Sequence, residues 1–403
     1  MGGTSVYDMA LSGTLNKEFT AQTGINVQME TLTDPILLQR SELELSSGGS
    51  SYDVIRMFFI KTGHFIGAGW CSPLDAYIAR DAKEVDVSDF PTYAFQVGQA
   101  NGHTYSLPWG ADVQLLAYRK DVLDKFGVTN APNTFDDLKS VCAKINTKEL
   151  AAIVMRGAPQ ASAAAWIYPA FLQAYGGNVF ADPPTDLTPT LNTQSAIDSA
   201  VMFTTLLRDY SVPGVGNFIY DDIVTAMSQG KAAMNIDGTF ALGAMMDPTK
   251  NPQAANMWFA EVPKGPQARR PQMAVHGWLI PVGAKNKDLS WEWIKWAVSK
   301  SVIKEVALDF PYPPVVRQSV LLDADYLKKY NWAGGKFGQL VLDSIPLTRI
   351  AYRYVSEFLP VGDRLGVALS QILSNQMKPK DALDAAQKDA VDILTRAGVK
   401  VHS

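Results

Sequence analysis

Residues 105–121, YSLPWGADVQLLAYRKD, decide the fold of this chain. An aromatic side chain, Trp109, and a carboxylate, Asp112, stand in an extended segment that runs directly into the apolar, strand-like residues 113–118. A segment of this kind can cross from one lobe of a protein to another. We therefore expect the chain to form two lobes.

The length and composition agree with a two-lobed globular protein. The chain has 403 residues, which is more than one hydrophobic core usually serves. Hydrophobic residues make up 47% of it and charged residues 19%, which leaves no room for a large disordered fraction.

The charge pattern argues against nucleic acid and anionic membranes as partners. The formal net charge is -4 and the chain has no basic run, whereas either partner would favour clustered Lys and Arg. The most apolar stretch, residues 161–175, is too short to span a bilayer, which needs roughly 20 apolar residues. Residues 1–5 show no secretory signal, so we expect any export signal to have been removed.

Cysteine, histidine and nucleophile motifs predict no catalytic chemistry. Cys71 and Cys142 lie in apolar patterns typical of buried thiols, and a disulfide between them is the less favoured alternative. None of the four histidines has another His or a Cys at the spacing typical of metal ligands. The sequence also contains neither a nucleophile elbow nor a Gly-rich phosphate loop. We expect no catalytic residue, no metal and no cofactor.

Hydrophobic periodicity predicts alternating helices and strands in the first part of the chain. Apolar residues recur every four positions over residues 8–23 and stop at Gly24, which predicts a helix. Residues 25–29 then alternate as in a strand, a helical run through Leu37 and Leu45 follows, and residues 52–55 read as a buried strand. This order predicts a parallel sheet with crossover helices.

The same pattern returns beyond residue 118. Thr134 is expected to cap a helix, and residues 151–155 read as a strand. Near the end, one apolar helix face stops before Gly398. Trp291, Trp293 and Trp296 fall in an amphipathic helix and are expected to serve packing.

Several short motifs, in order, resemble one protein family. They are FTAQTGINV at 19–27, YDVI at 52–55, GAGW at 67–70, GKAAMNIDG at 230–238 and GWLIP at 277–281. Together with residues 105–121 they resemble family 1 of the extracellular solute-binding proteins of ABC importers, which are maltose-binding-protein-like.

The resemblance implies an α/β fold, the two-lobed periplasmic-binding-protein fold of type II, with parallel-rich sheets, crossover helices and three interlobe crossovers. The N-lobe would hold residues 1–112 and 280–316, and the C-lobe residues 113–279 and 317–403. The implied function is that of the substrate-binding component of an ABC importer. It would bind a mono- or oligosaccharide, sugar alcohol or sugar derivative between two closing lobes and catalyse nothing.

The resemblance also implies partners, location and site residues. The partners would be the transmembrane permease subunits, and the protein a monomer in the periplasm or outside the cell, with lipid anchoring left open. Sugars need flat aromatic faces and hydroxyl partners. The residues carried over as solute contacts are Gly3, Tyr7, Phe58, Lys61, Trp109, Asp112, Trp166, Asp237, Thr239, Phe240, Gly277, Trp278, Tyr312 and Arg349.

Two departures from the family keep alternatives open. The strand that precedes the first helix in the family has only residues 1–7 available here. Phe58 and Lys61 stand where sugar-binding relatives often carry an acidic residue and a Trp that face the ligand, and Lys61 would tolerate an anionic solute. A polyamine or an amino-sugar conjugate is the alternative solute. A thiaminase-like enzyme of the same fold is a further alternative, although neither cysteine lies in residues 107–118.

Overall fold

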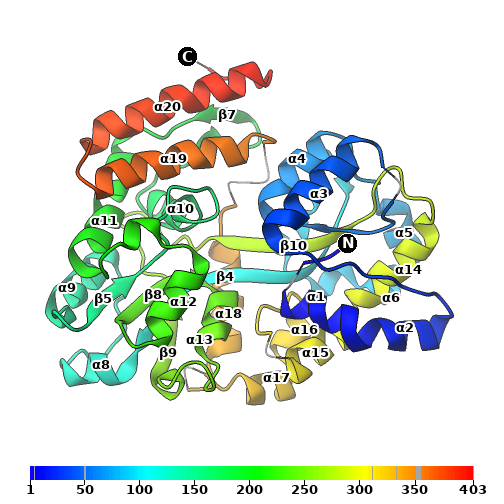
Figure 1. Cartoon of the computed structure of the whole chain (residues 1–403), viewed down its shortest axis with the longest axis horizontal. Coiled ribbons are helices and arrows are strands. Elements are labelled where there is room, and N and C mark those ends of the chain that lie inside the picture. The colour runs from blue at the N-terminus through cyan, green and yellow to red at the C-terminus, as the bar shows by residue number, and fades with distance from the viewer. Residues whose placement is uncertain (4, 50, 311, 333, 351–354, 403) are drawn as a thin grey trace. The chain divides into compact units, whose positions relative to one another are not determined.

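The structure is a computed structural model that describes residues 1–3, 5–49, 51–310, 312–332, 334–350 and 355–402. The chain forms two compact units (Figure 1). Unit 1 comprises Met1–Asp112 and Ala274–Asn331, and unit 2 comprises Val113–Met273 and Trp332–Ser403. The chain thus changes unit after residues 112, 273 and 331, whereas the sequence places these changes after residues 112, 279 and 316.

Unit 1 combines short helices with short strands. Its elements before the first change of unit are α1 (Val6–Ala10), the π-helical turn η1 (Leu11–Leu15), α2 (Asn16–Thr23), α3 (Asp34–Ser46), β1 (Ile55–Met57), η2 (Phe59–Lys61), α4 (Thr62–Gly67), α5 (Asp75–Arg80), α6 (Ala82–Val85), η3 (Val87–Asp89), α7 (Thr92–Val97), β2 (Gln99–Ala100) and β3 (His103–Thr104). Its later elements are α14 (Lys287–Ala297), α15 (Lys300–Asp309), α16 (Gln318–Leu321) and α17 (Ala324–Lys329).

Two strands belong to both units by residue number. β4 (Leu107–Arg119) begins in unit 1 and ends in unit 2, and β10 (Met273–Leu279) begins at the last residue of that part of unit 2. In β4 every residue except Asp112 is buried. This burial confirms that residues 113–118 form an apolar strand.

The first predicted helix is confirmed. α1, η1 and α2 follow one another without a break from Val6 to Thr23, and Gly24 ends them with a left-handed φ of 74°. Glycine suits this end because it has no Cβ to clash in the left-handed region. α3 likewise confirms the predicted helix through Leu37 and Leu45.

Two predicted strands of unit 1 are wrong in detail. Residues 25–29 alternate between half-buried and exposed as predicted, but they form no strand, because they pair with no neighbouring strand among the described residues. The buried strand expected at residues 52–55 instead begins at Ile55 and runs to Met57. It pairs antiparallel with β10, with Arg56 opposite Trp278.

Unit 2 holds longer helices around the remaining strands. Its elements are α8 (Lys120–Lys125), α9 (Phe135–Ile145), β5 (Ala151–Val154), α10 (Ala164–Ala174), β6 (Phe180–Asp182), β7 (Asp186–Pro189), α11 (Gln194–Tyr210), η4 (Val215–Asn217), α12 (Tyr220–Ser228), β8 (Ala232–Gly238), α13 (Thr239–Met245), η5 (Ala254–Asn256), β9 (Met257–Glu261), α18 (Phe337–Ser344), η6 (Ile345–Leu347), α19 (Phe358–Leu373) and α20 (Pro379–Arg396).

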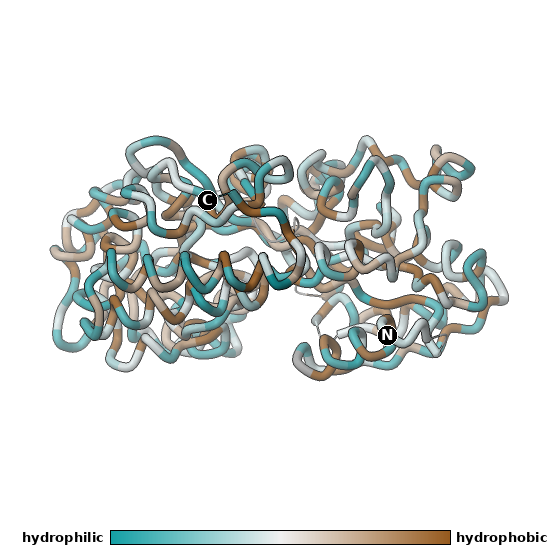
Figure 2. The backbone as a smooth tube through the Cα atoms, turned by 90° about the horizontal axis from the view of Figure 1, so that it is seen from above, coloured by the Kyte–Doolittle hydropathy of each residue, from teal (hydrophilic) through white to brown (hydrophobic). Residues whose placement is uncertain are grey.

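Local sequence signals account for several ends of these helices. Thr134 caps α9 as predicted: its hydroxyl accepts from the Asp137 N–H at 3.0 Å, and the Asp137 carboxylate accepts from the Thr134 N–H at 3.0 Å. Gly398 follows α20 with a φ of 77°. α19 and α20 pack side by side (Figure 1), and hydrophilic and hydrophobic positions interleave along the helices (Figure 2).

The strand pairing is mixed, so the expectation of parallel-rich sheets was wrong. Among the described strands β5 and β8 pair in parallel, whereas β1 with β10, β4 with β8 and β4 with β9 pair antiparallel. Helices α10, α11 and α12 lie between β5 and β8 in the chain and supply the crossover that parallel strands need. Helices also lie between β4 and its partners β8 and β9 in the chain, yet both of these pairings are antiparallel.

Each unit has its own apolar core. In unit 1, Leu37 and Leu45 of α3 pack with Ile55 and Leu279 and enclose Cys71. In unit 2, the rings of Phe135 and Phe171 stack with centroids 4.1 Å apart. Cys71 and Cys142 are both buried free thiols, as their apolar surroundings predict.

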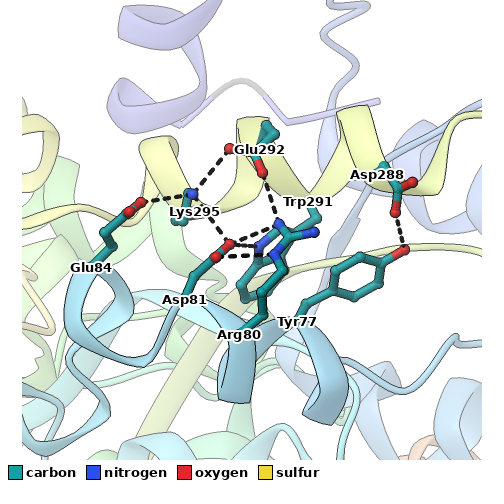
Figure 3. A network of polar contacts seen from close by, with 8 residues as sticks. All are labelled: Tyr77, Arg80, Asp81, Glu84, Asp288, Trp291, Glu292 and Lys295. Carbon is teal, nitrogen blue, oxygen red and sulfur yellow. Dashed lines mark hydrogen bonds and ion pairs between the residues drawn. The ribbon is translucent and has the colours of Figure 1, made fainter.

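A polar network fastens α14 to α5 and α6 at the surface of unit 1 (Figure 3). Asp81 accepts from the indole N–H of Trp291 at 2.6 Å and from Lys295 at 3.2 Å, and hydrogen bonds from Arg80 and then Trp291 hold its pKa well below the usual range. Trp291 and Trp293 are buried, which confirms their predicted packing role. None of the helices within the described residues combines the length and the apolar character that crossing a membrane requires.

Candidate functional site

Six aromatic side chains, five of them predicted from the sequence, form a cluster in unit 1. We use "aromatic cluster" for Tyr7, Phe58, Trp109, His276, Trp278 and Tyr312. Tyr7 and Trp109 stack with centroids 4.4 Å apart and an angle of 7° between their planes. The other neighbours of the Trp109 ring are His276 at 5.4 Å, Tyr312 at 5.9 Å and Trp278 at 6.3 Å. The structure therefore brings together five of the predicted side chains.

An ion pair lies against this cluster. Arg56 of β1 donates to Asp8 of α1 at 2.9 Å, and their side chains are 4% and 0% exposed. The guanidinium lies 5.2 Å from the Trp109 ring and 5.3 Å from the Phe58 ring. Arg56 also donates to Asp34 at 3.4 Å, and burial raises the pKa of Asp34 although Arg56 acts against that rise. A charge this deeply buried needs these partners.

Gly3 faces this ion pair. A Cβ built on Gly3 would lie 1.8 Å from Nη1 of Arg56 and 3.0 Å from Oδ2 of Asp8. Only a residue without a side chain leaves room for the guanidinium there. Gly277 has a packing role instead, because its Cβ would lie 2.2 Å from the Ser106 hydroxyl and 2.7 Å from the Leu107 carbonyl oxygen.

Four buried polar atoms of the cluster and its ion pair have no hydrogen-bond partner among the described residues. They are Oδ1 of Asp8, Nε of Arg56 and the indole nitrogens of Trp109 and Trp278. A buried donor or acceptor left without a partner costs about 1–3 kcal/mol. One acceptor and three donors thus remain available to a polar molecule.

His276 is held neutral in the cluster. Arg56 Nη2 lies 3.4 Å from its Nδ1, and the rings of Phe58 and Phe59 lie within 5.1 and 5.5 Å. Burial first, and the charge of Arg56 second, lower its pKa well below the usual 6.5.

This shift predicts a pH dependence of stability. Below pH 6.5 the unfolded chain gains a proton on His276 that the folded chain does not, so stability should fall by up to about 1.4 kcal/mol per pH unit as the pH drops. We expect His276→Asn to flatten this slope in urea unfolding measured from pH 7 to pH 5. His103→Asn, at a side chain 58% exposed, is the control and should keep the slope. Equal slopes in the two variants would show that His276 does not cause this pH dependence.

Lys61 is paired within unit 1. Its ammonium lies 2.5 Å from Oε2 of Glu42 on α3, and the Lys61 side chain is 14% exposed. The positive charge that the sequence suggests for an anionic solute is therefore already balanced by a carboxylate.

Unit 2 contains a second charged and aromatic group. Asp237 of β8 is fully buried and accepts two bonds from Arg156, at 2.6 and 2.8 Å. The Arg156 guanidinium lies 5.3 Å from the ring of Tyr220, which stacks on Phe240 at 5.4 Å. Tyr220 and Phe240 are both half-buried, so these two rings keep some exposed surface.

The remaining predicted residues occupy varied settings. Asp112 is half-buried in β4, and its charge contributes to a raised pKa of Tyr312, for which burial is the larger cause. Trp166 is 5% exposed on α10, and its carbonyl oxygen accepts from the Gln114 amide at 3.1 Å. Thr239 is buried at the start of α13. Arg349 is exposed and donates to the carbonyl oxygen of the adjacent Thr348 at 2.7 Å.

Sequence reasoning missed several members of both groups. Asp8, Arg56, Arg156 and Tyr220 were not predicted, and His276 was noted only for its neighbours. One signal was available for Arg56: it is a charge inside the apolar run 54–60, where a buried cation needs a partner. The partner itself, Asp8, lies 48 residues away and is not marked by any local pattern.

No described group of residues is arranged for metal chemistry or for a reactive thiol. Among the described residues, no three His, Cys, Asp or Glu side chains converge as metal ligands. Burial raises the pKa of both Cys71 and Cys142, which disfavours the thiolate that a nucleophile requires.

Comparison with known proteins relates this arrangement to solute-binding proteins. The chain is 23% identical over 413 residues to the mannitol-binding protein of Pseudomonas aeruginosa, covering 97% of this chain and 92% of that protein. It is 24% identical over 324 residues to the erythritol/L-threitol-binding protein of Mycolicibacterium smegmatis, covering 76% and 67%.

Solved structures match over almost the whole chain. An ABC transporter solute-binding protein of Agrobacterium radiobacter K84 in complex with ribitol has a TM-score of 0.86 and 25% identity, covering 97% of each chain. A solute-binding protein of Agrobacterium vitis S4 with bound D-mannitol has a TM-score of 0.83 and 25% identity, covering 98% of each chain. The fold is therefore the two-lobed α/β fold of periplasmic solute-binding proteins, as the resemblance predicts.

The family model agrees with these similarities. The model described as bacterial extracellular solute-binding protein matches residues 10–304, which is more than half of the chain. The chain therefore belongs to the bacterial extracellular solute-binding protein family.

Proposed function

We propose that this chain is the substrate-binding component of an ABC importer and that it binds a linear polyol or a sugar. The observation that carries the proposal is the match to the ribitol complex over 97% of each chain, with a TM-score of 0.86. The solved mannitol complex and the two polyol-binding relatives support the same class of solute.

The unpartnered atoms in unit 1 support a solute rich in hydroxyl groups. Oδ1 of Asp8 requires a donor, whereas the indole N–H groups of Trp109 and Trp278 require acceptors. A hydroxyl group both donates and accepts, so a polyol can satisfy both kinds of atom. Binding then removes the cost of leaving them unpaired.

The charge balance supports a neutral solute. Lys61 is paired with Glu42, Arg56 with Asp8, and Asp237 with Arg156. An anionic solute would find Lys61 already neutralised, and a cationic polyamine would find the same at Asp237. The polyamine and amino-sugar alternatives are therefore less favoured than a neutral polyol or sugar.

The aromatic rings support a linear polyol more than a large sugar ring. A pyranose stacks its C–H face on an open aromatic face. Trp109 is 1% exposed and is packed against Tyr7, and Trp278 is also 1% exposed. The half-buried Tyr220 and Phe240 pair has more surface for such stacking.

A binding protein that acts without catalysis fits the family and the cysteines. Both thiols are buried with a raised pKa, which disfavours the thiaminase-like alternative. As part of this proposal, the protein is exported, works as a monomer and delivers its solute to the permease subunits of the importer. Solute contacts with both units would favour a closed form that the permease recognises.

A thermal-shift screen tests the function. At a hundred times its Kd, a ligand stabilises the folded protein by about 2.7 kcal/mol. We expect ribitol, mannitol, erythritol or a monosaccharide to raise the Tm, and spermidine, sugar acids and amino acids to leave it unchanged. A shift with polyamines alone would overturn the proposal, as would the absence of any shift in protein refolded from urea to remove bound solute.

The Asp112→Ala variant tests whether the solute binds at the predicted site. If the Asp112 carboxylate accepts from a solute hydroxyl, its loss should weaken binding by roughly ten- to a hundredfold, the equivalent of about 1–3 kcal/mol. Isothermal titration with the best polyol measures this change. The matched control is Asp124→Ala, at a surface carboxylate 50% exposed that pairs with Lys120. Equal Kd values for the two variants would remove Asp112 from the site.

A further inference from the structure

Two carbonyl groups at the C-terminal end of α14 accept hydrogen bonds from side chains, and the proposed function makes no use of them. The last carbonyl groups of a helix have no partner within the helix itself. The Tyr7 hydroxyl donates to the Ala297 carbonyl oxygen, and Nε and Nη2 of Arg317 donate to the Val298 carbonyl oxygen at 3.0 and 2.8 Å. Two side chains from distant parts of unit 1 are therefore tethered to one helix end.

Arg317 is buried and held from several sides. It is 1% exposed, and its guanidinium lies 3.8 Å from the centre of the Phe90 ring. Nη1 donates to the Asp86 carbonyl oxygen at 3.0 Å, and the Asp89 carboxylate lies 3.7 Å away. Burial lowers the pKa of Arg317 to about 10, so the guanidinium keeps its charge at neutral pH. These partners hold the buried cation in one orientation, which makes it a fixed point for the chain around it.

Residues 312–317 connect this fixed point to the aromatic cluster. They are buried, although they form neither helix nor strand. A Cβ built on Gly110 of β4 would lie 2.9 Å from the Tyr312 hydroxyl oxygen and 3.2 Å from the Pro314 carbonyl oxygen. The segment therefore lies directly against β4 beside Trp109.

Trp109 lies between the two tethered parts of the chain. Tyr7 stacks on its ring at 4.4 Å with an angle of 7° between the planes, and the Tyr312 ring lies 5.9 Å from it at 42°. The Trp109 indole N–H is one of the buried donors without a partner among the described residues. The direction in which this N–H points follows from the orientation of the ring, which the two tyrosines restrict.

α14 supports a third ring of the cluster as well. Trp293 of this helix contacts Trp278 edge-on, with ring centroids 4.9 Å apart. The helix itself is fastened to α5 and α6 by its polar network (Figure 3). One anchored helix thus holds Tyr7 directly, Tyr312 through Arg317 and Trp278 through Trp293.

We propose that the end of α14 orients Trp109 for the solute, and that Tyr7 and Arg317 are the positioning residues. The inference rests on the proposed function, because that function pairs the Trp109 N–H with a solute hydroxyl. A hydrogen bond weakens steeply as its angle departs from linear, so a small rotation of the Trp109 ring weakens binding. Tyr7, carried over from the family as a solute contact, acts through Trp109 in this proposal.

Two variants each remove one tether. Tyr7→Phe deletes the hydroxyl and keeps the stacked ring, whereas Arg317→Met deletes the guanidinium and keeps most of the apolar volume. Lys304→Met is the matched control in the same unit. Lys304 fastens α15 to α17 through ion pairs with Asp323 and Asp325 at 2.8 and 2.9 Å, and these pairs involve neither α14 nor the aromatic cluster.

The first readout is the indole N–H signal of Trp109 in NMR spectra of protein made with isotope-labelled tryptophan. The Trp109→Phe variant assigns this signal by its loss. We expect the signal to shift or broaden in Tyr7→Phe and in Arg317→Met, and to keep its position in Lys304→Met. The signal of Trp258 in unit 2 should stay constant in all variants. This measurement requires no solute, so it tests the orientation of Trp109 even if the proposed class of solute is wrong.

The second readout is the Kd for the best polyol, corrected for the folded fraction found by urea unfolding. We expect each tether variant to bind about tenfold more weakly, which matches the loss of roughly one hydrogen bond, and Lys304→Met to stay within about twofold. If Arg317→Met does not fold, Tyr7→Phe decides alone, because it removes a single oxygen atom.

The outcomes separate the two proposals. An unchanged Trp109 signal in the tether variants, an equal change in Lys304→Met, or an unchanged Kd would overturn the positioning role. A change in one tether variant alone would remove that role from the other residue. If the unaltered protein bound no polyol or sugar, the proposed function would fail, whereas the Trp109 signal would still decide whether Tyr7 and Arg317 orient the ring.

Discussion

Trp278→Ala is expected to lower the free energy of unfolding by about 3–5 kcal/mol, the range measured for truncating large buried aromatic side chains. The resemblance to the family implies that the flat face of Trp278 contacts the solute. The structure instead places the ring 1% exposed, 4.9 Å from Trp293 in an edge-on contact and 6.3 Å from Trp109. Its removal would leave a cavity that these neighbours cannot fill.

Urea unfolding followed by circular dichroism checks this prediction. The control is Trp258→Ala, because Trp258 is half-buried at the surface of unit 2 beneath Lys120 and should lose clearly less stability. If Trp278→Ala cost no more than Trp258→Ala, the buried position of Trp278 would be wrong. Contact between Trp278 and the solute stays a separate prediction, to be measured only on the variant's folded fraction.

Arg56→Met should destabilise the protein by a similar amount, about 3–5 kcal/mol. The substitution keeps most of the apolar volume but leaves Asp8, whose side chain is 0% exposed, as a buried carboxylate without its cation. Asp8→Asn in the same background removes the unpaired charge. We therefore expect the double variant to be more stable than Arg56→Met alone.

A surface ion pair supplies the matched control for the Arg56 and Asp8 variants. Arg364 lies 3.7 Å from Asp389, and the two side chains are 54% and 48% exposed. Arg364→Met should change stability by no more than about 1 kcal/mol. If Arg56→Met lowered stability no more than Arg364→Met does, Arg56 would not be needed to balance the buried Asp8 carboxylate. The same would follow if Asp8→Asn lowered the stability of the Arg56→Met variant further.

Helices were the part of this fold that local sequence predicted best. The apolar spacing over residues 8–23, the end at Gly24 and the capping residue Thr134 all reappear in the structure. These signals act within a few residues of the chain, through backbone conformation and hydrogen bonds to nearby N–H groups. They therefore do not depend on what packs against the helix.

Strands were predicted less well because a strand needs a partner. Residues 25–29 alternate correctly but pair with no strand among the described residues. The direction of pairing was also missed, since β4 pairs antiparallel with both β8 and β9. Neither the presence nor the direction of a distant partner is written in a local alternation pattern.

The site likewise contains residues that the sequence predicted and residues that depend on tertiary contacts. Resemblance to the family named Tyr7, Trp109, Trp278 and Tyr312, which the structure gathers in one cluster. It did not name Arg56, because a buried cation is tolerated only where the fold brings a carboxylate such as Asp8 beside it. The resemblance to the family predicted the aromatic residues, whereas the pairing of charges depends on contacts between distant segments.

By itself, the sequence determined the family, the α/β class and the main helices. Those properties rest on residue types, short spacings and composition, which a linear chain already contains. Only the tertiary structure decided which strands pair, which Trp rings are buried, and that Lys61 and Asp237 are neutralised by Glu42 and Arg156. These properties depend on the desolvation and pairing of groups far apart in the chain, and such energies exist only once the fold brings the groups together.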